Sequence, residues 1–494
     1  MTVSSNFPHI GKDGRGNPTL YVDGKPYLML GGELHNSSAS SADYMEREVW
    51  PWLRELNMNT VLFTVAWEDI EEQEGVYDFT LLQQILEQAR REDMRLVMLW
   101  FGLWKNGESY YVPRWMKQDT ETYFRMERTA GVPGVTISPF CEAAVEKDRA
   151  AFTALMSYLA AQDTQHTVIT VQVENEIGLL GATYDRSEIS RRTLAGPVPA
   201  ELAEFCGVSG KDWWEAFGPD AGEYLLAYTY ARAVEKIASS GKAVWPLPMY
   251  INAWQDQHPA RPGYYPVGGP VSRNIPIWRR FAPSIDLCAP DIYAADFIGV
   301  CEKYDLPDNP LFIPETVRAP INASNLFYVF GAMHCIGYAP FGIEDIMKQK
   351  APETPAYLAA SYRILREFAP LFFAYRGTDR LQAFIKRWPV ESGCILPLDD
   401  CDLQLDYVGG GEGKPSSGGL VLQTEGGFYL IGCNIRYTLH PKIDSDKRID
   451  LLRVEEGEFV NGEWRRGRIL NGDEVWHTTM GEVPSCRFIG VNLV

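Results

Sequence analysis

The stretch TVITVQVENEIG, residues 167–178, combines an apolar β-strand signal with three polar side chains at its end. Its valines, isoleucine and threonines form a near-continuous run, which is typical of a strand that is covered on both faces of a sheet. Glu174, Asn175 and Glu176 follow directly. A carboxyl group at such a position is partly withdrawn from water, which raises its pKa unless a partner compensates. The pattern therefore predicts a buried parallel strand whose carboxyl end bears a functional site.

Similar apolar runs alternate with helix-like segments as far as residue 375. Apart from the first stretch, they cover residues 26–35, 60–67, 95–104, 248–254, 286–293, 310–316 and 336–345. Leu82, Ile85 and Leu86 mark one of the apolar helix stripes between them. Eight buried strands alternating with helices predict a (β/α)8 TIM barrel over residues 1–375, with long loops after strands three and four. A doubly wound sheet is the alternative, but no G-x-G-x-x-G sequence follows a strand.

The hydrophobic pattern changes at the end of this region. The remaining residues form short alternating runs that are separated by turn signals. Asn461-Gly462 and Asn471-Gly472 both favour the tight turn of a β-hairpin. Residues 376–494 are therefore predicted to form a separate, all-β, sandwich-like domain.

The composition argues against several classes of protein. The chain has 494 residues, with 46 Lys and Arg against 65 Asp and Glu, so its formal net charge is −19. This charge opposes binding to nucleic acid or to an anionic membrane surface. The 9 cysteines have no C-x-x-C spacing, so we expect neither a disulfide framework nor a zinc knuckle. The N-terminus shows no secretory signal, and we expect a cytoplasmic protein; whether it forms homo-oligomers stays open.

Polar residues end three of the predicted strands, at residues 174–176, 291–293 and 314–316. In a barrel these strand ends meet at one mouth. Cleavage of a glycosidic bond needs two carboxyl groups there, one to protonate the leaving oxygen and one to attack the anomeric carbon. A single strand-end glutamate is equally well explained as a structural ion-pair partner. Glu176 and Glu315 together, with Asn175 and Tyr293 beside them, favour catalysis.

Several motifs resemble known glycoside hydrolases. QVENEIG at residues 172–178 and FIPET at residues 312–316 resemble the ends of strands four and seven in the retaining glycoside hydrolases of clan A. Closer resemblance is to the β-galactosidases of glycoside hydrolase family 35, including relatives with a distinctive C-terminal β domain. It rests on GGELHNSS (31–38), WEDIEEQEGVYDF (67–79), WFGLWKNGESYYVPRWMK (100–117) and PFGIED (340–345). The resemblance implies a retaining exo-β-galactosidase that acts on oligosaccharides or glycoconjugates and needs no cofactor.

The resemblance also implies roles for four residues. Glu176 would be the acid/base and Glu315 the nucleophile. Asn175 would bind the 2-hydroxyl of the sugar, and Tyr293 would orient Glu315 and keep it ionised. The chain departs from the family pattern at residues 68–75 and at Ile177, so that specificity for a β-glucoside or a β-mannoside stays open.

Further strand-end residues are predicted to line the sugar subsite. Trp104 and Trp254 are expected to stack on a pyranose ring, and Lys105 and Asn106 to bind its hydroxyl groups. Packing at the barrel rim is the alternative for Trp67 and Trp104. The full predicted set is Glu33, Trp67, Trp104, Lys105, Asn106, Asn252 and Trp254.

Two other classes of function stay open. Glu33 and His35 share one strand face, which raises the alternative of a metal-dependent barrel hydrolase. No second histidine-rich strand end accompanies them, so no metal site is expected. A catalytically silent carbohydrate-binding protein is the other class, and the intact pair of Glu176 and Glu315 argues against it.

Overall fold

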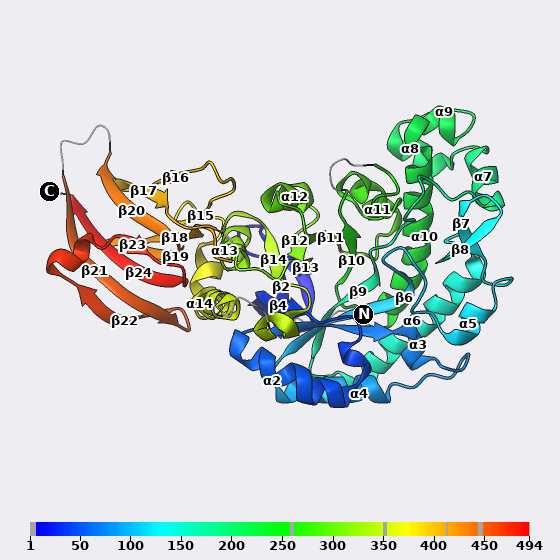
Figure 1. Cartoon of the computed structure of the whole chain (residues 1–494), viewed down its shortest axis with the longest axis horizontal. Helices are drawn as coiled ribbons and strands as arrows, with labels where there is room; N and C mark the ends of the chain where they lie inside the picture. The colour runs from blue at the N-terminus through cyan, green and yellow to red at the C-terminus, as the bar shows by residue number, and fades with distance from the viewer. Residues whose placement is uncertain (1–5, 257–260, 349–352, 412, 443–447, 494) are drawn as a thin grey trace.

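The structure is a computed structural model that describes residues 6–256, 261–348, 353–411, 413–442 and 448–493. It has two parts (Figure 1): a ring of parallel strands wrapped by helices and, at the left of the view, two antiparallel sheets. One apolar core lies between the ring and its helices and continues into the larger antiparallel sheet, and a separate apolar cluster fills the ring.

The ring is a closed barrel. Its strands pair in the order β12-β14-β4-β5-β6-β9-β10-β11-β13. β12 and β13 are two halves of one strand, separated by Pro314, which has no N–H to donate to the ladder. β12 pairs with β14 and β13 pairs with β11, so the sheet closes with eight strands. The predicted fold class, a TIM barrel followed by an all-β part, is confirmed.

Each barrel strand overlaps a run that the sequence predicted. The bounds are β4 (Met29–Glu33), β5 (Thr60–Ala66), β6 (Arg95–Lys105), β9 (Val168–Asn175), β10 (Met249–Trp254), β11 (Leu287–Ile292), β12 (Leu311–Ile313), β13 (Glu315–Thr316) and β14 (Cys335–Tyr338). A small sheet of β1 (His9–Lys12), β2 (Pro18–Val22) and β3 (Lys25–Tyr27) precedes them. Leu20 and Val22 of β2 pack against the side chains that fill the barrel, and so they close its amino end.

Helices surround the barrel. They include α4 (Thr80–Arg91), α6 (Glu142–Gln162), α10 (Ala221–Val244), α11 (Ile275–Phe281), α12 (Phe297–Tyr304), α13 (Asn322–Ala332) and α14 (Thr354–Tyr375). The connection after β6 adds α5 (Arg114–Gln118) and the hairpin β7 (Arg125–Thr129) and β8 (Val132–Ile137). The connection after β9 adds α7 (Glu188–Leu194), α8 (Ala200–Cys206) and α9 (Trp213–Phe217). Within the described ranges, no helix is long and apolar enough to cross a membrane.

Two antiparallel sheets follow α14. The larger has the order β15-β18-β19-β24-β21-β22 and the smaller the order β16-β17-β20-β23. Leu403 and Ile435 of the smaller sheet share an apolar core with Leu430 and Ile489 of the larger one, so the two sheets pack face to face. The bounds are β15 (Leu381–Ile385), β16 (Gly393–Pro397), β17 (Cys401–Tyr407), β18 (Gly418–Thr424), β19 (Gly427–Cys433), β20 (Ile435–Pro441), β21 (Ile449–Val460), β22 (Glu463–Leu470), β23 (Thr479–Met480) and β24 (Ser485–Leu493). The boundary after residue 375 stays a prediction.

The two hairpin signals have different outcomes. Asn461 and Gly462 join β21 to β22 with φ angles of 51° and 82°, as a type I′ turn requires. The prediction for Asn471-Gly472 is wrong. The Asn471 side chain accepts a hydrogen bond from the Gly472 N–H and caps the short helix η7 (Gly472–Trp476). The chain crosses there from the larger sheet to the smaller one, so no hairpin forms.

The larger sheet packs against α13. A Cβ atom added at Gly331 of this helix would lie 2.9 Å from the Ala383 Cβ and closer still to the buried Leu420 side chain. Gly418, at the start of β18, lies against Ser324 in the first part of α13. The sheet therefore runs beside the helix with its Gly418 end near the helix N-terminus.

This packing leads to a stability prediction. Gly331→Val should lower the free energy of unfolding by about 1–3 kcal/mol, because adding atoms to a packed contact forces its neighbours apart. Ala332→Val places the same side chain at an exposed position of the same helix, and it should change the value by less than about 0.5 kcal/mol. Urea denaturation measures both. Equal losses would contradict the close contact between α13 and the sheet.

Candidate active site

Polar side chains from neighbouring barrel strands meet at the carboxyl end of the barrel. The Lys105 ammonium group donates a hydrogen bond to Asn175 Oδ1 (2.9 Å), at the position where β6 and β9 pair. The cluster comprises Glu33 (β4), Lys105 (β6), Asn175 and Glu176 (end of β9), Asn252 (β10), Asp291 and Tyr293 (end of β11) and Glu315 (β13).

Asn252 connects two of these strand ends. Its Oδ1 atom accepts a hydrogen bond from the Glu176 N–H (2.9 Å), and its amide group donates one to Asp291 Oδ2 (2.7 Å). On the next strand, the Tyr293 hydroxyl donates to Glu315 Oε1. Asn252 thus fixes the backbone at Glu176, and Tyr293 fixes the side chain of Glu315.

Glu176 and Glu315 lie in different electrostatic surroundings, although both are nearly buried, with 6% and 7% of their surface exposed. Burial and the charge of Glu315 raise the pKa of Glu176 to about 7. Burial also raises the pKa of Glu315, but the charge of Lys105 and the hydroxyl of Tyr293 oppose this rise. Because the charge of Glu315 is itself a cause of the raised pKa of Glu176, Glu315 is the member of the pair that ionises first, and Glu176 still holds its proton in part of the molecules at pH 7.

Glu33 and Asp291 complete the group of carboxyl side chains. Burial raises the pKa of each well above its usual range, and the charge of Glu315 raises it further. Lys105 lowers both values. Asp291 lies two residues before Tyr293, on the face of β11 that points into the barrel mouth, and this spacing was the signal that would have added it to the predicted set.

Three buried polar atoms in the cluster have no hydrogen-bond partner within the described part of the chain. They are Asn175 Nδ2, Asp291 Oδ1 and Glu315 Oε2, from β9, β11 and β13. Leaving such an atom unpaired costs about 1–3 kcal/mol. A polyhydroxylated ligand would supply the missing donors and acceptors, so these atoms mark where such a ligand binds best.

The end of β9 has an unusual backbone. Glu174 and Glu176 adopt left-handed φ angles of 63° and 44°, which are rare for residues with side chains and cluster at functional sites. The Glu174 side chain is fully buried on the outer side of the barrel, where it accepts hydrogen bonds from the N–H groups of Leu103 (3.2 Å) and Trp104 (2.7 Å). This carboxyl group therefore holds the end of β6 beside the end of β9.

Glu174 shares its site with a second carboxyl group. Asp148 of α6 accepts from the same Leu103 N–H (3.1 Å) and from the Trp100 indole (2.8 Å). Burial and the charge of Asp148 raise the pKa of Glu174 well above its usual range, so the pair retains one proton. Gly102 gives them room, because an added Cβ would lie 2.5 Å from Asp148 Oδ2 and 2.6 Å from Glu174 Oε1.

The structure does not bring two of the predicted tryptophans to the cluster. Trp67 and Trp104 are fully buried on the outer side of the barrel. The indole of Trp67 donates to Glu71 (2.6 Å), and that of Trp104 donates to the Ile137 carbonyl (2.9 Å). Leu103 and Trp104 both belong to the core between the strands and the helices, because the register of β6 against β9 shifts between Trp100 and Lys105.

Two other predicted residues lie beside the cluster. Trp254 ends β10 on the same face as Asn252, and it is partly exposed. Asn106 has a left-handed φ of 52°, and its N–H donates to the Asn175 carbonyl (3.2 Å). Both residues are therefore placed to contact a ligand bound at the cluster.

The proposed metal alternative finds no geometric support. His35 does not join Glu33 but pairs with Asp345 (2.8 Å), and Ser38 donates to Glu344 (2.6 Å). Across the residues that the structure describes, no group of three or more His, Cys, Asp and Glu side chains is arranged to hold a metal ion. These contacts instead join two of the family-like motifs, residues 31–38 and 340–345.

Comparisons with family models give two matches. Residues 19–205 match the model for glycosyl hydrolases family 35, and residues 358–480 match a domain of unknown function, DUF5597. No match was found among curated proteins. The first match confirms, for residues 19–205, the resemblance to the glycosyl hydrolases of family 35.

Similar solved structures include two β-galactosidases. One, from Rahnella sp. R3, has 15% identity and a TM-score of 0.44, and the alignment covers 64% of this chain and 50% of that one. The other, from Bacillus circulans sp. alkalophilus, has 14% identity, a TM-score of 0.44 and coverage of 63% and 50%. The catalytic domain of β-amylase from Paenibacillus polymyxa has 10% identity, a TM-score of 0.48 and coverage of 64% and 92%. The chain thus spans about half the length of the two β-galactosidases.

The pair of Glu174 and Asp148 makes stability depend on pH. The folded pair holds one proton that the unfolded chain loses above pH of about 4.5, so the free energy of unfolding should fall as pH rises from there to the folded pKa. Glu174→Gln removes this proton. The free energy of unfolding of this variant, minus that of the unchanged protein, should therefore increase by about 1.4 kcal/mol per pH unit in this range.

Urea denaturation at a series of pH values measures the difference. Glu72→Gln makes the same substitution at an exposed position and should follow the unchanged protein at every pH. Parallel curves for Glu174→Gln and the unchanged protein would show that the pair does not hold the proton.

Proposed function

We propose that this protein is a glycoside hydrolase, a retaining exo-β-galactosidase that removes terminal non-reducing β-D-galactose by double displacement. The observation that carries the proposal is the pair of Glu176 and Glu315. The two buried carboxyl groups end different strands at one barrel mouth. The charge of Glu315 helps to raise the pKa of Glu176 to about 7, and Lys105 and Tyr293 favour the ionised form of Glu315. Such a division supplies a proton donor and an ionised nucleophile at the same pH.

In the first step, Glu315 attacks the anomeric carbon while Glu176 protonates the leaving oxygen. The Tyr293 hydroxyl holds Glu315 Oε1, so the unpaired Oε2 atom is the one available for attack. As the charge on Glu315 is consumed, the pKa of Glu176 falls, because that charge was one cause of its high value.

In the second step, Glu176 is the base that activates water, and water releases the sugar from Glu315. The lowered pKa suits Glu176 to this change of role. The amide of Asn175 is held by Lys105 through its oxygen, which leaves its unpaired Nδ2 free to donate to the 2-hydroxyl of the sugar. That hydrogen bond strengthens as the transition state develops positive charge.

The choice of galactose rests on the family 35 resemblance. A β-glucoside or a β-mannoside is the second candidate, because residues 68–75 and Ile177 depart from the family pattern. The sugars differ in the orientation of single hydroxyl groups, and a site that hydrogen-bonds each hydroxyl discriminates strongly against the wrong orientation.

A panel of aryl β-glycosides separates the two candidates. The 4-nitrophenyl β-galactoside should be cleaved with a kcat/KM at least tenfold above those of the β-glucoside and β-mannoside. Release of nitrophenol is the measurement, and the α-galactoside is the control that should stay intact. A higher value for either competing sugar would replace galactose in the proposal, and cleavage of none would reject it.

Azide distinguishes the two glutamates. Each substitution to alanine should lower kcat by about 10²–10⁴-fold or more. Azide should rescue Glu176→Ala on an activated aryl galactoside with a β-galactosyl azide product, because Glu315 still forms the covalent intermediate. In Glu315→Ala no intermediate forms, so azide attacks the substrate directly and should give the α-product.

Proton NMR of the azide product reads the configuration. The unchanged enzyme in azide is the control and should release galactose. A β-product from Glu315→Ala would exchange the two roles, and full activity of both variants would place the active site elsewhere.

A further inference from the structure

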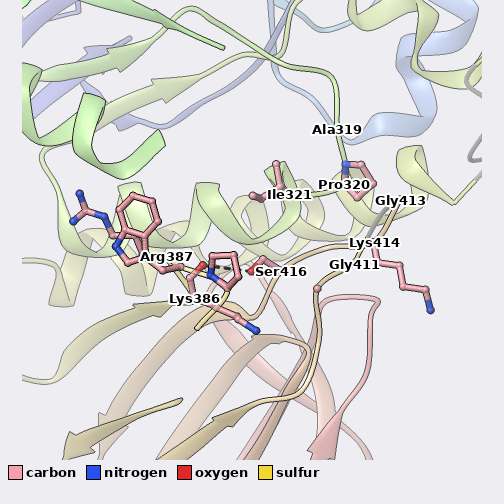
Figure 2. Close-up of a pocket in the computed structure, with 12 residues that line it drawn as sticks. Ala319, Pro320, Ile321, Lys386, Arg387, Gly411, Gly413, Lys414 and Ser416 are labelled. Atoms are coloured by element: carbon pink, nitrogen blue, oxygen red, sulfur yellow. Dashed lines mark hydrogen bonds between the residues drawn. The ribbon is translucent and has the colours of Figure 1, made fainter. Parts of the chain in front are cut away.

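A pocket of about 640 Å³ lies between the barrel and the C-terminal sheets. Pro320 and Ile321 lie on its barrel side, and Lys386 and Ser416 lie across from them on the side of the sheets (Figure 2). The barrel residues belong to the connection between β13 and α13, which begins directly after Glu315 and Thr316. The pocket therefore adjoins the loop that follows the nucleophile.

The pocket is at the level of the barrel mouth. β15 and β18 run beside α13 with Ile385 and Gly418 near the start of that helix, which is at the carboxyl end of the barrel. Residues 386–392, 408–411 and 413–417, which lie at those strand ends, thus stand beside the catalytic face. Arg387 fixes the first of these loops by ion pairs with Asp296 (3.2 Å) and Glu302 (3.0 Å).

The ion pair of Arg387 with Asp296 connects the loop of residues 386–392 to a segment that is near the candidate active site in sequence. Asp296 caps the N-terminus of α12 and follows Tyr293 by three residues. The loop after β11 therefore carries Tyr293, which donates to Glu315, at one end and Asp296, which pairs with Arg387, at the other.

Trp388 follows Arg387 and has 41% of its surface exposed. Its loop is held in one conformation. The N–H groups of Arg387 (2.7 Å) and Trp388 (3.2 Å) both donate to Glu391 Oε2, and the Glu391 N–H donates back to the Trp388 carbonyl (3.0 Å). A large aromatic ring on a fixed loop binds a ligand without first losing conformational entropy.

The chemistry of the pocket suits a sugar. Trp388, Pro320 and Ile321 present apolar surface, and the Lys386 ammonium group is a donor for hydroxyl groups. A pyranose ring has one apolar face and a polar edge, which is the combination that an exposed indole with a polar neighbour binds. Lys386 makes no ion pair with any of the described residues, so its donors are available.

We propose that this pocket is a distal subsite that binds the aglycone part of a neutral oligosaccharide whose terminal sugar occupies the site of Glu176 and Glu315. The inference rests on the proposed function and deepens it. The pocket is lined on its barrel side by Ala319, Pro320 and Ile321 and by none of the residues of the terminal-sugar site, so it serves substrates that extend beyond that site. The C-terminal domain thereby gains a role in selecting chain length.

The test compares a long and a short substrate. Trp388→Ala should lower kcat/KM for β-1,4-galactotetraose about tenfold and leave that for 4-nitrophenyl β-galactoside within twofold. Trp388→Tyr keeps a flat aromatic face and should recover most of the loss. Trp476→Ala removes another exposed tryptophan of the same domain, and it should affect neither substrate.

Equal losses on both substrates, or no loss on either, would overturn the subsite. Binding gives a readout that does not depend on hydrolysis. Calorimetric titration of galactotetraose into Glu315→Ala, with and without Trp388→Ala, should show weaker binding in the double variant. If the unchanged enzyme cleaves neither substrate, the proposed function fails, and this titration alone decides the subsite: an unchanged affinity overturns it, and a weakened one supports it.

Discussion

One ammonium group faces four carboxyl groups at the mouth of the barrel. Within the described residues, Lys105 is the cation whose charge lowers the pKa of Glu33, Glu176, Asp291 and Glu315 alike. A single positive charge cannot hold four buried negative charges, so some of these groups stay protonated. Local hydrogen bonds decide which. Tyr293 donates to Glu315 and favours its ionised form, and Glu176 carries the proton that glycoside cleavage consumes.

The position of Lys105 depends in turn on how β6 and β9 end. Glu174 turns away from the barrel mouth and binds the N–H groups of Leu103 and Trp104, which ties the two strand ends together. The left-handed backbone at Glu174 and Glu176 costs roughly 1–3 kcal/mol per residue, and the buried hydrogen bonds around it offset this strain. The strained backbone and the hydrogen bonds of Glu174 thus act together to direct Asn175 and Glu176 into the barrel mouth.

The larger C-terminal sheet packs tightly against the helices of the barrel. Leu420 and Ile431 of the larger sheet belong to the same apolar core as the barrel helices, and Gly331 allows α13 to approach that sheet closely. Arg387 adds ion pairs to the start of α12. The loops of the domain that matches DUF5597 are therefore held at a defined place beside the catalytic face.

The sequence by itself determined the eight barrel strands and the residues at their ends, because a strand buried on both faces must be apolar until it reaches the mouth. It therefore pointed to Glu176, Glu315 and their neighbours on the inner face. Tertiary structure decided where each neighbouring side chain points. Trp67 and Trp104 were predicted to face the sugar, but Trp67 begins the short helix α3 (Trp67–Ile70) and Trp104 lies where the register of β6 shifts. Both side chains pack in the core between the strands and the helices.

Other features were also beyond the reach of the sequence. Asp148 meets Glu174 from a different element, and the pocket beside Trp388 joins segments that are far apart along the chain. Such groupings depend on how helices and sheets pack at long range. Local hydrophobic patterns record which residues are buried, but they do not record which buried residues meet.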